Sequence, residues 1–129
     1  MPATNLWGVL PHLPEVQPTP LSILREQADV ITAHYNGVLE GEVETTTAQN
    51  KIKGVLNIIA PALGYYKLLI IEVTYDIMGP GLGINVFNHI EQQSQNCNAM
   101  AQYEQILRTY LSSDRVRTTI TKLLEQSRA

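Results

Sequence analysis

The sequence lacks the residues that cross-link small proteins or build cysteine-rich metal sites. Its 129 residues include one cysteine, Cys97. One cysteine excludes a disulfide within the chain and a metal site made only of cysteines. The chain also lacks an opening basic segment followed by an apolar one, so no secretion signal is predicted. Both features are typical of a reducing compartment, and we therefore expect a cytoplasmic protein.

Charge and long apolar runs are also scarce. Charged residues make up 16% of the chain, against about 25% in typical soluble domains. The formal net charge of −3 provides no field that would attract nucleic acid or an anionic membrane, so neither is predicted as a partner. The longest apolar run, Leu68–Ile71, is far shorter than the roughly 20 residues of a membrane-spanning helix.

Nucleotide-binding and metal-binding motifs are missing as well. The glycine-rich segment 79–83 is followed by Ile84 and Asn85, whereas a phosphate-binding loop needs a lysine and a hydroxyl residue at that point. The segment is therefore interpreted as a connector. We predict no cofactor, no metal and no catalytic residue.

A small enzyme or ligand-binding domain, with a pocket between sheet and helices, remains the alternative. Cys97 and His89 are the residue types of a thiol nucleophile and its base, provided that they lie within hydrogen-bond reach. Cys97 is expected just before a helix, whose N-terminus favours a thiolate. The other candidates are His34 and the alternating Glu40, Glu42 and Glu44. A row of carboxylates along one strand is more typical of a solvated face than of a catalytic pair.

Residues 1–18 are predicted to form an extended arm, because Pro2, Pro11, Pro14 and Pro18 interrupt them. The arm also carries apolar side chains, namely Leu6, Trp7, Val9, Leu10 and Leu13. A disordered tail has little use for this much apolar surface. We therefore expect the arm to lie against the body of the protein or against a neighbouring subunit.

Residues 19–129 are predicted to form a single α+β domain. Thr19 and Pro20 mark a helix start, and apolar residues then recur every three or four positions up to Asn36-Gly37. From Val38 the period changes to two, which predicts strands near 38–47, 51–60 and 65–77. A fourth strand over 84–90 is less clearly marked, and 91–98 is interpreted as a polar loop.

Two more helices are predicted after this loop, the first capped by Asn98 and the second starting at Ser113-Asp114. The expected fold is an antiparallel sheet of three to four strands, covered by one N-terminal helix and two C-terminal helices. Amphipathic helices cover the apolar face of such a sheet.

The predicted function is that of a non-catalytic protein-interaction module, of an accessory, immunity or antitoxin type. Its partner is an unidentified protein, and a homodimer or other homo-oligomer is one form this interaction can take. The predicted contact residues are Trp7 and Leu10 in the arm and Tyr65 and Tyr66 in the body. Tyrosine and tryptophan combine large apolar contact area with a polar tip, which suits an interface.

Overall fold

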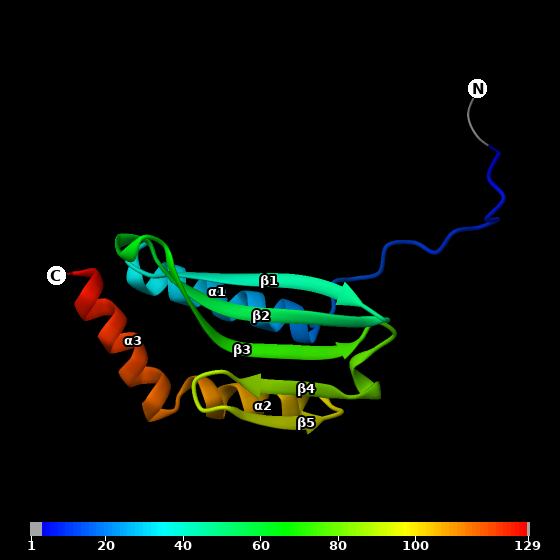
Figure 1. Ribbon diagram of the computed structural model, residues 1–129. Helices are drawn as coiled ribbons and strands as arrows, with labels where there is room; N and C mark the ends of the chain where they lie inside the picture. Colours follow the sequence, from blue (N-terminus) through cyan, green and yellow to red (C-terminus); the bar gives the residue numbers. More distant parts are fainter. Residues whose placement is uncertain (1–3, 129) are drawn as a thin grey trace.

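The computed structural model describes residues 4–128, which form an α+β fold with an antiparallel sheet of five strands (Figure 1). The strands follow one another in the order β1-β2-β3-β4-β5, so the sheet is a meander. The helices are α1 (Pro20–Tyr35), α2 (Met100–Leu111) and α3 (Asp114–Ser127). The strands are β1 (Glu40–Ala48), β2 (Lys51–Ala60), β3 (Tyr66–Asp76), β4 (Ile84–Asn88) and β5 (Gln93–Cys97). Short 3-10 turns, Pro61–Leu63 and Pro80–Leu82, flank β3.

The predicted start of α1 is confirmed. The Thr19 hydroxyl accepts a hydrogen bond from the Ser22 amide, and the Ser22 hydroxyl accepts one from the Thr19 amide. These two bonds satisfy backbone donors that the first turn leaves free. The helix ends earlier than predicted, at Tyr35, because Asn36 adopts a left-handed conformation with φ of 50°.

The prediction of three to four strands is corrected to five. The segment interpreted as a loop contains β5, which pairs antiparallel with β4 from Ile84 opposite Cys97 to Asn88 opposite Gln93. Its sequence, Gln-Ser-Gln-Asn-Cys, lacks the apolar alternation that marks a strand. Asn98 does not cap α2 either, since the cap position is Ala99 without a side-chain hydrogen bond.

The core lies between the sheet and the helices, which cover one face only; Figure 1 shows α1 and α2 behind the strands. Side chains of alternate strand positions fill this layer, including Leu56, Val73 and Val86, and Leu24 of α1 is fully buried against them. The close approach of α1 to β1 requires glycine at position 41. A Cβ at that position would overlap the backbone of Ala28. The Gly41 amide also donates to the Thr32 hydroxyl of α1, at 2.9 Å.

Strand β3 is paired on both sides along only part of its length. It pairs with β2 from Tyr66 to Asp76, with a bulge at Ile70, which has no partner because Leu69 lies opposite Asn57 and Ile71 opposite Leu56. It pairs with β4 only from Ile71 to Tyr75, and the His89 amide donates to the Ile70 carbonyl at the end of that pairing. Within residues 4–128, no strand lies along the other edge of residues 66–70. We call this segment the free half-edge of β3.

Residues 4–18 extend away from the body of the molecule (Figure 1). The hydrogen bonds made by Asn5, to the carbonyl of Gly8 and from the amide of Trp7, remain within the arm. The arm's apolar side chains are 53–97% exposed: Leu6, Trp7, Val9, Leu10, Leu13 and Val16. The expectation that the arm lies against its own body is therefore not met by this conformation.

No helix among residues 4–128 combines the length and the apolar character needed to cross a membrane.

Candidate functional site

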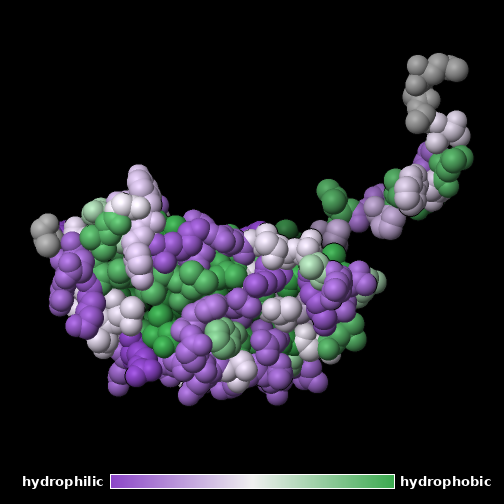
Figure 2. Space-filling view, in the orientation of Figure 1, coloured by the Kyte–Doolittle hydropathy of each residue, from purple (hydrophilic) through white to green (hydrophobic). Residues whose placement is uncertain are grey.

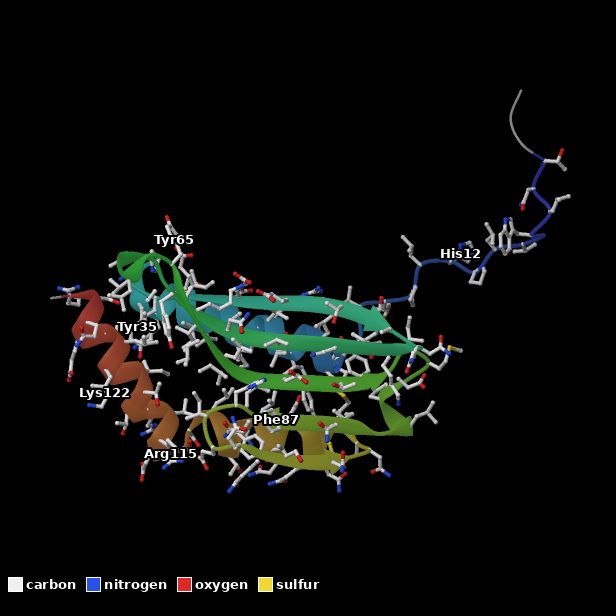
Figure 3. All side chains as sticks on the ribbon, in the orientation of Figure 1. His12, Tyr35, Tyr65, Phe87, Arg115 and Lys122 are labelled. Atoms are coloured by element: carbon white, nitrogen blue, oxygen red, sulfur yellow. The ribbon has the colours of Figure 1, made fainter. Side chains whose placement is uncertain are left out.

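The predicted contact residues lie at two separate places. Trp7 and Leu10 are in the arm, which leaves the body at the N-terminal end of α1. Tyr65 lies directly before β3 and Tyr66 is the first residue of this strand, and Figure 3 shows Tyr65 at the opposite end of the molecule from His12 in the arm. Tyr65 is 71% exposed and Tyr66 is 49% exposed. The chain does not bring its two predicted contact regions together.

A groove runs between α3 and the start of β3, beside Tyr66. It has a volume of about 320 Å³. Apolar side chains line most of it, namely Leu63, Tyr66, Leu68 and Leu123, and its polar residues are Thr119, Lys122 and Gln126 of α3. Hydrophobic surface is visible between α3 and the sheet in Figure 2. We call this feature the edge groove, because the free half-edge of β3 forms one of its sides.

The edge groove exists because β3 reaches further than β4. Alternation along β3 places Tyr66 and Leu68 on the same side as α3, while Lys67 and Leu69 point to the other face of the sheet. Alternation also points every second backbone amide and carbonyl of a strand toward one of its edges. The groove therefore combines apolar side-chain contacts with backbone groups of β3 that no strand among residues 4–128 pairs with.

The face of the sheet opposite the helices carries an ion-pair cluster. Lys67 of β3 reaches across β2 to Glu44 and to Glu42 of β1, the latter at 3.4 Å. The hydrogen bond from Lys67 holds the pKa of Glu44 below its usual value, and the same bond raises the pKa of Lys67. Glu42 and Glu44 thus take part in cross-strand pairing, which is a structural role for two of the three predicted strand carboxylates.

Beneath this cluster lies a buried amide. Asn57 of β2 sits opposite Glu42 on one side and Leu69 on the other. It is 1% exposed, and neither atom of its amide has a hydrogen-bond partner in residues 4–128. The burial of this polar side chain was not predicted from the sequence.

His89, one of the proposed catalytic residues, belongs to a second cluster on the same face. Its Nε2 lies 3.3 Å from Glu72, and Lys53 lies 3.7 Å from the same carboxylate oxygen. The His89 ring packs edge-on against Phe87, with ring centroids 4.8 Å apart. Figure 3 places Phe87 on β4. Histidine here pairs with a carboxylate and an aromatic ring.

Cys97 lies away from His89. It pairs with Ile84 at one end of the β4-β5 hairpin, while His89 follows the other end. Four residues of strand span about 13 Å. Cys97 also lines a hollow with Ala101 and Gln105 of α2, on the helix-covered side of the sheet. The proposed nucleophile and base are therefore not brought together.

The environment of Cys97 also differs from the one proposed for a reactive thiol. Burial raises the pKa of the Cys97 thiol, and a backbone hydrogen bond involving Ala99 offsets this only in part. A raised pKa favours the neutral thiol, whereas nucleophilic cysteines need the thiolate. His34, the remaining candidate, lies in the last turn of α1, where it contacts the ring of Tyr35 edge-on.

A second groove, of about 420 Å³, separates α1 from α2. Ile23, Leu107 and Leu111 form its apolar part, and ionisable side chains from three helices border it: Glu26, Glu104, Arg108 and Arg117. All four of these side chains are exposed. Water screens the interactions between charges in such positions. Within residues 4–128, no three His, Cys, Asp or Glu side chains lie close enough to hold a metal ion.

Sequence reasoning identified the arm and Tyr66 but missed the groove that Tyr66 borders. The sequence gives one signal for it, an apolar segment from Leu68 to Ile71 that does not alternate. A strand that is buried on both faces has the same pattern. Whether such a segment borders a groove or is buried on both faces depends on the relative lengths of β3 and β4. Those lengths are set by pairing across the sheet, which the segment itself does not reveal.

The chain matches no protein-family model, no curated protein and no solved structure with which it was compared.

Proposed function

We propose that this chain is a protein-interaction module that self-associates through its N-terminal arm. The observation that carries the proposal is the exposure of the arm: six apolar side chains, the only tryptophan among them, extend from the body without cover. Exposed apolar surface on this scale is unfavourable in water and is typical of interaction sites. Contact with another protein molecule would remove it from solvent.

The arm is also suited to hold a partner at low entropic cost. Its prolines restrict the backbone of the free chain, so less freedom is lost on binding. Trp7 has the side chain that contributes most often to interface energies. A cytoplasmic location, which we infer from the single cysteine, suits an association that needs no disulfide.

The test compares two double variants of the full chain by sedimentation equilibrium. Trp7→Ser with Leu10→Ser removes apolar surface from the arm. Met78→Ser with Leu82→Ser is the matched control, since these side chains are 84% and 70% exposed on the body. We expect the wild-type chain and the control to form a dimer or larger oligomer in a concentration-dependent manner, and the arm variant to remain monomeric.

A wild-type chain that stays monomeric at its highest soluble concentration would contradict self-association. An oligomer that the control disrupts as strongly as the arm variant does would show that exposed apolar surface in general, rather than the arm, drives association.

A further inference from the structure

We infer that the free half-edge of β3 accepts the arm of a second copy as an added strand. This inference rests on the proposed function and names the surface that receives the arm. In strand addition, backbone hydrogen bonds to a free sheet edge hold the peptide, and pockets beside the edge bind its alternate side chains. The edge groove supplies both features at one place.

In the part of the chain that the structure describes, three edges of the sheet have no neighbouring strand, and they differ in character. The edge strand β1 carries Glu40, Glu42 and Glu44, and charges of this kind oppose pairing with another chain. The edge strand β5 is five residues long and mostly polar. The free half-edge of β3 reads Tyr-Lys-Leu-Leu-Ile, and it is the most apolar of the three. An apolar peptide therefore gains most at β3.

The arm contains a segment that matches this edge. Thr4 to Leu10 has no proline, so each of its residues keeps the amide that a strand ladder requires. These seven residues are sufficient to span the five residues of the half-edge. The turn formed by Asn5 with Gly8 is solvent-exposed and costs little to open, and glycine tolerates either conformation.

The geometry favours the arm of a second copy over the chain's own arm. The arm starts at the N-terminal end of α1, and the edge groove lies at the other end of the molecule (Figure 1). The 16 residues of α1 alone extend about 24 Å. The chain's own segment would have to reverse its direction and cross the sheet. Reciprocal exchange of arms between two copies needs no such reversal and closes a dimer.

A proline scan of the arm tests the backbone pairing without altering the folded body. Gly8→Pro and Val9→Pro each remove one amide from adjacent positions. Because successive amides point in opposite directions, only one of the two faces β3. We expect one variant to weaken the dimer by about tenfold or more, and the other much less. Val16→Pro, outside the segment, is the matched control and should leave the dissociation constant unchanged.

Two substitutions on the body test the acceptor side. Tyr66→Ser removes a side chain that lines the edge groove, whereas Tyr65→Ser removes its neighbour, which does not line it. We expect Tyr66→Ser to weaken the dimer by about tenfold, and Tyr65→Ser to have little effect. Hydrogen exchange provides a direct readout: every second amide of residues 66–70 should exchange more slowly as the protein concentration rises.

The outcomes separate this inference from the proposed function. A dimer that depends on Trp7 and Leu10, but responds equally to Gly8→Pro, Val9→Pro and Val16→Pro, would overturn strand addition and leave arm-mediated association standing. Unchanged exchange of residues 66–70 in such a dimer would place the arm elsewhere and would also overturn the inference. A chain that never associates would contradict both.

Discussion

Apolar side chains of the same types are buried in the body of this protein and exposed in its arm. In the body, leucine, isoleucine and valine from α1 and the strands are packed between two layers, and Leu24 has no exposed surface. In the arm, Leu13 and Val16 are almost completely exposed, at 97% and 96%. The two regions do not differ in apolar character but in whether their own chain can cover it. Apolar content alone therefore does not tell whether a segment stabilises its own fold or a contact with another molecule.

This difference has a physical cause. The body alternates its apolar residues at periods that match a helix or a strand, so each element presents one continuous face to the core. In the arm, Pro11, Pro14 and Pro18 interrupt any helix between the proline-free residues 4–10 and the start of α1. The arm consequently presents no continuous apolar face to the core, and its apolar side chains are exposed.

The comparison is tested most strongly by deleting the same side chain in each region. Leu24→Ala should lower the free energy of unfolding by about 2–5 kcal/mol, since it leaves a cavity between α1 and the sheet. Leu13→Ala should change it by less than about 0.5 kcal/mol, the range of surface positions. Urea denaturation at a concentration where the chain is monomeric provides both values. If both substitutions lowered the free energy of unfolding equally, the arm would have to pack against its own body.

Two glycine substitutions test the same difference between the packed body and the exposed arm. Gly41→Ala forces β1 away from the backbone of Ala28 and should cost about 1–3 kcal/mol, as overpacking does. Gly8 of the arm has φ of 71° and open space around it, and the arm can relax without disturbing the body. Gly8→Ala should therefore leave the melting temperature unchanged. A stable Gly41→Ala variant would show that α1 and β1 are less closely packed than described.

The smallest effect is expected at the junction of the two regions. The buried Tyr103 hydroxyl of α2 donates to the carbonyl of Pro20, at 2.6 Å, and thus fixes the start of α1 where the arm begins. Tyr103→Phe removes this hydrogen bond between α2 and the start of α1 and should cost about 1 kcal/mol. Tyr65→Phe, at an exposed position, is the control and should have no measurable effect. A neutral Tyr103→Phe would indicate that this bond adds nothing to the anchoring of α1.

Local signals in the sequence predicted most of the fold. Thr19 and Pro20 mark the start of α1, and Pro61 marks the end of β2. These signals work because capping and proline geometry act within a few residues of the chain. The strand β5 was missed because its residues are polar, and its pairing with β4 supplies what local preference does not.

The candidate site was predicted only in part, for a related reason. Trp7, Leu10, Tyr65 and Tyr66 were identified from residue type, and all four are exposed. The edge groove was missed because it arises from three separate facts: β3 is longer than β4, β3 contains a bulge, and α3 returns beside it. None of these is encoded within a single short segment.

The most direct measurement of the central claim is the fluorescence of Trp7, the only tryptophan in the chain. Its emission should shift to shorter wavelength as the protein concentration rises, because the indole moves from water into contact with a second copy, and the shift should parallel the formation of the dimer. Emission typical of a solvated indole at every concentration would contradict the account. A blue shift that is independent of concentration would show that the arm folds onto its own body instead.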